Sequence, residues 1–180
     1  MLKIVFLLLL LFPLPTYCQP NLFQNYTELS KYECDFNGDG QLDKIVIYEK
    51  KCNNSDEDAI KSTCRRVAIF LKSNNNYLLY GYNDKVIECS ACGGAGTGDP
   101  FRGIKTKNKY FSIESLYGAC DKTFSVITFK FDKKSGKFFL YKIGTTDYSC
   151  KGEENSTGEI KITTTTKTEK DFGKINFINY

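Results

Sequence analysis

Short runs of β-branched and aromatic residues, each ended by turn-forming residues, dominate the chain from Lys44 onward. Val, Ile, Tyr, Phe and Thr favour strands, whereas clusters of Asn, Asp, Gly and Ser favour turns. The pattern therefore predicts a mainly β fold, a single antiparallel sheet or sandwich-like domain with long loops. The runs are Ile45 to Tyr48, Val67 to Leu71, Tyr77 to Tyr80, Val86 to Ile87, Tyr110 to Ile113, Phe124 to Phe131, Phe138 to Ile143, Ile160 to Thr166 and Ile175 to Ile178.

Three segments refine this prediction. The turn-forming sequence from Lys133 to Gly136 predicts a hairpin between the strands on either side of it. The threonine-rich stretch from Thr163 to Thr168 resembles a polar edge strand. The only helix that the sequence favours is Leu22 to Lys31, so we expect at most one short N-terminal helix.

The N-terminus has the pattern of a secretory signal. A lysine at position 3 precedes an uncharged stretch from Ile4 to Phe12, which is too short to span a bilayer. We expect residues 1–18 to be the signal peptide, with cleavage ahead of Gln19, and residues 19–180 to form the single β domain. The alternative is a lipoprotein anchored at Cys18. The predicted location is secreted or periplasmic, with no transmembrane segment after signal removal.

Composition excludes several functions. The chain contains no histidine, which removes histidine-dependent triads, Cys-His dyads and the usual catalytic zinc sites. The net charge is +4, but the lysines are spread along the chain instead of clustered in one segment. We therefore expect no nucleic-acid partner.

The cysteines predict disulfides, because an exported chain meets oxidising conditions. Cys52 and Cys64 bracket a polar loop, so a disulfide that closes this loop is the simplest pairing. Connectivity cannot be deduced from sequence for the others, and several pairings stay open. Our candidates are Cys89 with Cys92 and Cys120 with Cys150, which leaves Cys34 as the odd cysteine.

The clearest chemical motif runs from Asp35 to Asp43. Hard cations such as calcium need several oxygens near one centre and a chain that can turn sharply around the ion, and Gly40 permits such a turn. The twelfth position is Val46, where an EF-hand would place a bidentate Glu, so the loop is not an EF-hand. The expected calcium ligands are Asp35, Asn37, Asp39 and Asp43 through their side chains and Gln41 through its carbonyl. The alternative is a turn rich in Asp and Asn that holds no metal.

A second motif runs from Cys89 to Phe101 and is rich in glycine. In a phosphate loop, a Gly-Lys-Ser/Thr sequence leads into a helix whose N-terminus binds the anion. No such sequence follows here, and Pro100 is incompatible with that helix, so the motif is not a phosphate loop. The Cys89 and Cys92 pair could serve redox chemistry, but the βαβ context of such proteins is missing. We expect a structural disulfide here.

The two motifs together resemble known sequences. The Asp35 to Asp43 loop is similar to the DxNxDGxxD element of FG-GAP and VCBS-type β proteins. The Cys89 to Asn108 segment resembles the "CGGxxGDPFxGIxxKN" pattern of a family of exported bacterial proteins, and the similarity extends from about Tyr32 to Ile143. The chain departs from that pattern after Gly118. The resemblance implies a β domain in the cell envelope and brings no established activity.

The sequence thus predicts an exported, non-enzymatic, calcium-binding β domain whose partner is an unknown protein or surface ligand. The first rival is a periplasmic thiol-disulfide protein that uses Cys89 and Cys92. The second is a hydrolase built on carboxylates such as Asp99 and Glu114. For the second rival the sequence shows no paired-acid spacing.

Overall fold

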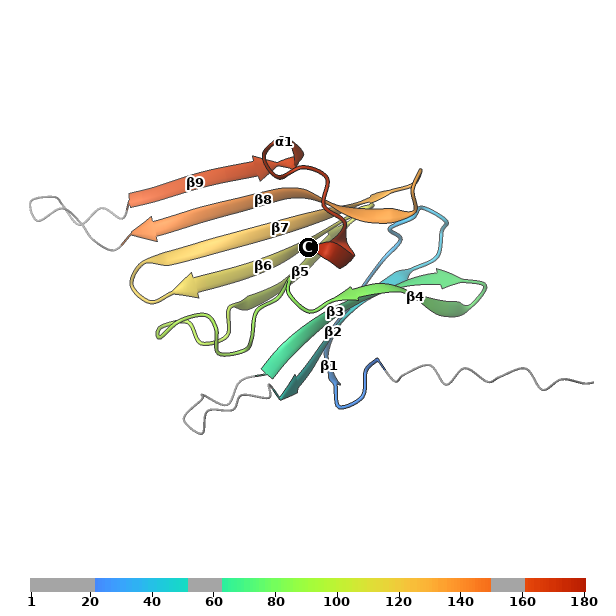
Figure 1. Ribbon diagram of the computed structural model, residues 1–180, viewed down its shortest axis with the longest axis horizontal. Coiled ribbons are helices and arrows are strands. Elements are labelled where there is room, and N and C mark those ends of the chain that lie inside the picture. The colour runs from blue at the N-terminus through green and yellow to red at the C-terminus, as the bar shows by residue number, and fades with distance from the viewer. Residues whose placement is uncertain (1–21, 52–62, 150–160) are drawn as a thin grey trace, which may run out of the picture.

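The computed structural model describes residues 22–51, 63–149 and 161–180. Two antiparallel sheets face each other (Figure 1). The first has the order β1 (Thr27–Cys34), β2 (Asp43–Lys51), β3 (Thr63–Ser73) and β4 (Asn76–Asn83). The second has the order β5 (Phe101–Lys107), β6 (Tyr110–Gly118), β7 (Lys122–Asp132), β8 (Lys137–Ser149) and β9 (Lys161–Thr168). A short helix α1 (Glu169–Phe172) and a 3₁₀ turn η1 (Phe177–Asn179) follow. The predicted mainly β fold is confirmed.

The core forms because alternate residues of each strand point between the sheets. The first sheet contributes Ile45, Ile47, Val67 and Ile69, all fully buried. The second sheet contributes mostly phenylalanines, and the Phe111 and Phe129 rings stack with their centroids 5.1 Å apart. The buried core residues of the second sheet are Ile104, Phe111, Ile113, Phe129, Phe131, Phe138 and Leu140.

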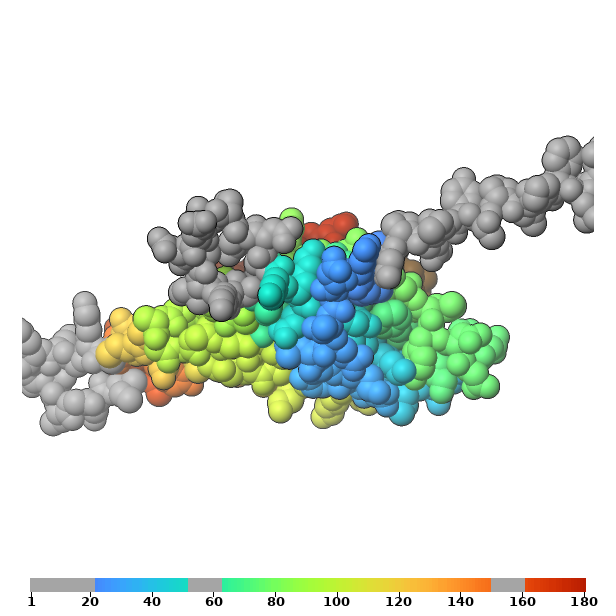
Figure 2. Space-filling model, turned by 90° about the horizontal axis from the view of Figure 1, so that it is seen from below, coloured from blue at the N-terminus to red at the C-terminus, as the bar shows by residue number. Residues whose placement is uncertain are grey.

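The sandwich is closed differently on its two sides. On one side β1 lies against β5, as Figure 2 shows where the blue strand borders the yellow-green segment that leads into β5. On the other side the C-terminal segment fills the gap between β8 and β4. Ile175 O accepts a hydrogen bond from Leu140 N at 2.8 Å, and Phe177 is fully buried against the rings of Phe111 and Phe129. The last residues of the chain are therefore part of the core.

Most of the strand predictions are confirmed. The predicted turn joins β7 to β8 in a hairpin in which Phe131 pairs with Phe138. β9 is the outer strand of its sheet, and every residue in it is exposed, as expected for a polar edge.

The predicted helix at Leu22 to Lys31 is wrong. Residues 22–25 form a turn, and Thr27–Cys34 is β1, whose Tyr32 and Cys34 pack against the core. Pairing with β2 over the whole strand outweighs the weak helix preference of this segment.

Two short apolar runs, predicted as strands, do not form strands, although Val86, Ile87 and Phe177 in them are buried. Val86 and Ile87 lie in a bend, where the Asn83 side-chain oxygen accepts from the backbone N–H of Lys85 and Val86. The Ile175 to Ile178 run contains one β-bridge and then η1. In both places packing between the sheets buries apolar side chains, those of Val86, Ile87 and Phe177, outside any strand.

Candidate metal loop

The predicted calcium ligands lie in the connection between β1 and β2. Asp35, Asn37, Asp39 and Gln41 are in the loop itself, and Asp43 is the first residue of β2. Gly38 and Gly40 have φ angles of 73° and 83°, the left-handed region that glycine adopts without strain. The two glycines let the chain fold back on itself within a few residues.

The Asp35 carboxylate is the centre of this loop. Its Oδ1 accepts from the backbone N–H of Gly38 at 2.6 Å and of Asp39 at 3.2 Å. Its Oδ2 accepts from the N–H of Gly40 at 2.9 Å. Each carboxylate oxygen has two lone pairs, so these bonds hold Asp35 in place and leave one lone pair, on Oδ2, for a cation.

Asn37 and Asp39 hold the rest of the loop together. Asn37 Oδ1 accepts from the N–H of Asp39 at 2.9 Å, and Asp39 Oδ1 accepts from the N–H of Gln41 at 2.8 Å. The Asn37 amide also donates to Asp39 Oδ2 at 3.0 Å. Three oxygen-bearing side chains, those of Asp35, Asn37 and Asp39, are thus gathered in one turn.

Unlike the other predicted ligands, Asp43 lies in the interior of the protein. It is fully buried, and its two oxygens accept from the backbone N–H of Phe36 at 3.0 Å and of Lys72 at 2.9 Å. Burial raises the pKa of Asp43, and the two backbone hydrogen bonds partly offset this effect. Asp43 therefore links the loop to β3, a contact that the local sequence pattern does not show.

In residues 22–51, 63–149 and 161–180, no group of three or more His, Cys, Asp or Glu side chains is arranged to hold a metal ion. The loop is a turn in which the Asp and Asn side chains accept hydrogen bonds from the loop's own backbone. A hollow of about 490 Å³ lies beside it, lined by residues that include Cys34, Asp35 and Lys133. The Lys133 ammonium lies so close to Gly38 that a Cβ there would come within 2.7 Å of Nζ.

Cys34 is a free cysteine at the end of β1. Its thiol donates to the Asn108 carbonyl oxygen at 3.3 Å. Burial is the largest cause of the raised pKa of Cys34, to which the nearby Asp35 and Asp43 charges add. A thiol in such surroundings is poorly ionised and a weak nucleophile.

Cys89 and Cys92 form a disulfide, as expected, with their Cα atoms 5.1 Å apart. The glycine-rich segment after it is held by its own backbone: Gly93 N donates to Gly98 O, and Gly118 N donates to Gly93 O. Gly93 is buried, and a Cβ there would lie 2.5 Å from Gly98 O. The glycines thus permit close backbone packing between this loop and the end of β6.

An ion pair fastens the same loop to the first sheet. Arg65 on β3 donates from both terminal nitrogens to Asp99, at 2.6 and 2.5 Å. The Arg65 side chain is 2% exposed and that of Asp99 is 43% exposed. Burial alone would raise the pKa of Asp99, but hydrogen bonds from Arg65 and Phe101 N–H bring it below its usual range. Sequence analysis missed this pair, because 34 residues separate its members and no local pattern marks it.

The remaining cysteine predictions are partly outside the described residues. Cys64 and Cys120 are each disulfide-bonded. Cys52 and Cys150, their expected partners, lie outside the described residues, as do Cys18 and the signal sequence. The Cys52 to Cys64 and Cys120 to Cys150 pairings therefore stay predictions.

The carboxylates of the hydrolase alternative have separate surroundings. Asp99 is bound to Arg65, whereas Glu114 on β6 alternates with the fully buried Ile113 and so points to the outer face of the sheet. An ionised Asp99 with a lowered pKa is a poor general acid.

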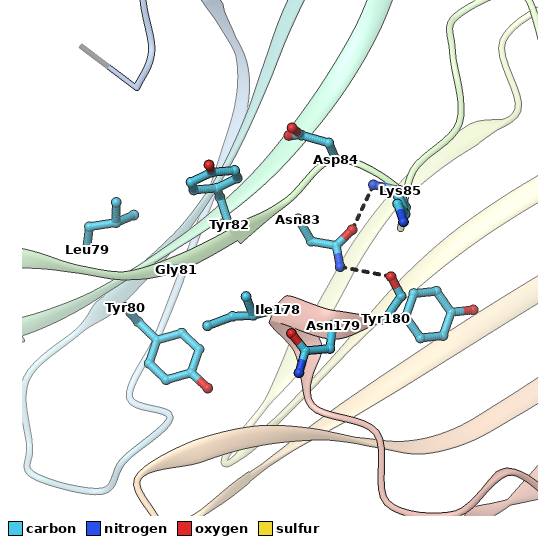
Figure 3. Close-up of a pocket in the computed structure, with 10 residues that line it drawn as sticks. All are labelled: Leu79, Tyr80, Gly81, Tyr82, Asn83, Asp84, Lys85, Ile178, Asn179 and Tyr180. Carbon is cyan, nitrogen blue, oxygen red and sulfur yellow. Dashed lines mark hydrogen bonds between the residues drawn. The ribbon is translucent and has the colours of Figure 1, made fainter. Parts of the chain in front are cut away.

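A hollow lies beside β4 and the C-terminal segment (Figure 3). It has a volume of about 630 Å³ and includes Gly81 and Ile178 in its lining. Asn83 braces this region, since its amide donates to Phe177 O at 2.6 Å and to Tyr180 O at 3.4 Å. The sequence pattern gave no indication of this hollow.

No helix among the described residues is long and apolar enough to cross a membrane. No family model, curated protein or solved structure matches this chain. The resemblance to exported bacterial proteins therefore rests on the motifs alone and stays a prediction.

Proposed function

We propose that this protein is an exported, non-catalytic β domain in which the loop from Asp35 to Asp43 binds calcium. The observation that carries the proposal is a local charge imbalance. The loop brings Asp35 and Asp39 into one turn. The Lys133 ammonium lies beside Gly38, but no Lys or Arg of the described residues forms an ion pair with either carboxylate. A cation from solution would relieve this repulsion.

The chemistry of the loop favours calcium over a transition metal. Its ligands would be carboxylate, amide and carbonyl oxygens, without the sulfur or imidazole that zinc and copper prefer. An exposed carboxylate (Asp39), a half-buried one (Asp35) and an amide, without a bidentate Glu, imply a modest Kd of about 10⁻⁵ to 10⁻³ M. Extracellular calcium would still fill such a site.

The ion would act on the stability of the whole domain because the loop contributes to the core. Phe36 follows Asp35 directly and is 1% exposed, with its ring packed edge-on against Phe111 and Phe138. Asp43 at the other end binds the N–H groups of Phe36 and Lys72. Ordering the loop would therefore hold Phe36 in the core and support the β2 to β3 pairing.

A structural role for the disulfide at Cys89 and Cys92 fits this proposal better than a redox role. Ser90, between the two cysteines, exchanges two hydrogen bonds with Thr63 on β3. The loop that follows is fastened by Arg65 and Asp99. A catalytic pair would have to open and close repeatedly within this bonded segment. Export, cleavage before Gln19 and the alternative anchor at Cys18 enter the proposal as predictions from the sequence.

Calcium should raise the melting temperature of the purified protein, and a chelator should reverse the rise. An ion that binds only the folded state stabilises it by about 2.7 kcal/mol when its free concentration is 100 times the Kd. Magnesium at the same concentration is the control, because its strict octahedral geometry suits this loop poorly. Superimposable melting curves in millimolar calcium and in chelator would contradict the proposal.

A further inference from the structure

The outer strands of the two sheets differ in charge. The sheets end in β1 and β4, and in β5 and β9. Strands β1, β5 and β9 all carry charged residues, among them Lys31, Lys105 and Lys167. Charged side chains, lysine above all, are how proteins keep exposed strand edges from pairing with other chains. β4 has the sequence Asn-Tyr-Leu-Leu-Tyr-Gly-Tyr-Asn and no charge at all.

The β4 edge is also unusually apolar and open. Leu78 is 60% exposed and Leu79 is 36% exposed, and Ile178 of the neighbouring C-terminal segment is 46% exposed. Within the described residues β4 pairs with β3 alone, and its backbone makes no further hydrogen bond to another segment. The 630 Å³ hollow runs along this side of the strand, next to Gly81 and Ile178 (Figure 3).

We propose that β4 pairs antiparallel with β4 of a second copy of this chain, which joins the two four-stranded sheets into one continuous sheet. The sequence of β4 is suited to antiparallel pairing with a second copy of itself. When the whole strand is paired, Asn76 lies opposite Asn83 and Tyr77 opposite Tyr82, and no charge meets a like charge. This is the isologous arrangement that a two-fold dimer requires.

Except at the central pair of Leu79 and Tyr80, the same pairing matches the two faces of the strand. Tyr77 and Tyr82 pair with Lys72 and Ala68 of β3 and lie on the outer face, whereas Leu78 and Gly81 pair with Leu71 and Ile69 and lie on the inner face. The irregularity at Tyr80 makes this match possible, because it shifts the alternation within β4 by one residue. A slip by one residue would place outer side chains opposite inner ones.

The register also brings Leu78 to the hollow of the partner copy. It places Leu78 of each copy opposite Gly81 of the other, where the Ile178 side chain covers the glycine. A Cβ on Gly81 would lie 2.7 Å from Cδ1 of Ile178, so the two are in close contact. The most exposed leucine of β4 would thus pack against Ile178 of the partner copy. An interface of one strand pair and these side chains is small, and so a reversible dimer in the micromolar range or weaker is expected.

The test measures mass against concentration, by light scattering and sedimentation, for the full chain with Cys34→Ser in every sample. That substitution prevents dimers through the free thiol. Leu78→Lys places a charge on the β4 edge, and Ile162→Lys is its matched control because Ile162 is 59% exposed on the edge strand β9. We expect a concentration-dependent dimer that Leu78→Lys shifts toward monomer by at least tenfold in Kd and that Ile162→Lys leaves unchanged. A monomer at all concentrations, or equal effects of the two lysines, would overturn the proposal.

A cross-link tests the register itself. In the proposed pairing the two-fold axis passes between Leu79 and Tyr80, so Leu79→Cys in both copies brings the cysteines within the range of a disulfide. Leu29→Cys on β1 is the control, since Leu29 is 40% exposed against 36% for Leu79. Mild oxidation should give a covalent dimer with Leu79→Cys and not with Leu29→Cys. Equal yields from the two variants, or none from either, would contradict pairing through β4.

Discussion

Phe177→Ala should lower the free energy of unfolding by about 3–5 kcal/mol, the usual cost of truncating a buried phenylalanine. For a domain of this size the melting temperature should then fall by roughly 6–20 °C. Phe177 has no exposed surface, and its ring packs edge-on against Phe111 at 5.9 Å and Phe129 at 5.3 Å. Its carbonyl oxygen also accepts from Asn83, so the cavity would open where the two sheets are joined.

Ile178→Ala is the control for this substitution, and chemical denaturation measures both. Ile178 is in the same 3₁₀ turn but is 46% exposed, so its truncation should cost less than about 1 kcal/mol. Equal losses for the two variants would mean that the C-terminal segment is not part of the core.

Asp99→Asn should destabilise the protein by about 1–3 kcal/mol at neutral pH. The substitution keeps the size of the side chain but removes the carboxylate that binds the Arg65 guanidinium, which is 2% exposed, and leaves it with Glu49 at 3.9 Å. Breaking a fully buried ion pair costs about 3–5 kcal/mol. We expect a smaller cost of about 1–3 kcal/mol here, because Asp99 is 43% exposed and water screens the pair.

The pH dependence separates this charge effect from a packing effect. The pKa of Asp99 in the folded protein lies below its ordinary value of 3.8, so the ion pair stabilises the fold above that pH and the contribution is lost as the pH falls further. The difference between the unchanged protein and Asp99→Asn should therefore shrink below about pH 3.8. Glu114→Gln, at a carboxylate that forms no ion pair with the described residues, should show no such trend. A difference that stays constant with pH would refute the ion-pair account.

The sequence predicted the strands that lie in the middle of each sheet. β2, β3 and β7 contain uninterrupted apolar runs, such as Ile45 to Ile47 in β2 and Val67 to Ile69 in β3. Such runs occur because a central strand, paired on both sides, is largely buried. β1 and β5 were not predicted, since they are outer strands with charged residues between the apolar ones. Their strand structure depends on the pairing partner more than on their own composition.

The candidate loop was predicted in part. The spacing of Asp35, Asn37 and Asp39 is a local pattern, and the structure gathers these side chains in one turn. The burial of Asp43 could not be predicted, because it depends on the N–H of Lys72, 29 residues further along the chain. For the same reason no pattern marked the Arg65 and Asp99 pair or the hollow beside β4.

The calcium proposal is tested most directly by Asp39→Asn, with melting measured in calcium and in chelator. The substitution keeps the size and turn preference of Asp39 but removes a negative charge, so a calcium site should lose affinity whereas a metal-free turn should hardly change. Asp132→Asn is the matched control, since Asp132 also holds a turn, through Ser135, outside the loop.

The account predicts a change of sign. Relative to the unchanged protein, Asp39→Asn should melt at a lower temperature in millimolar calcium and at the same or a slightly higher temperature in chelator, because it relieves repulsion with Asp35. Asp132→Asn should shift the melting temperature equally in both conditions. If Asp39→Asn also gives the same shift with calcium as with chelator, the loop is a turn without a metal and the proposed function is wrong.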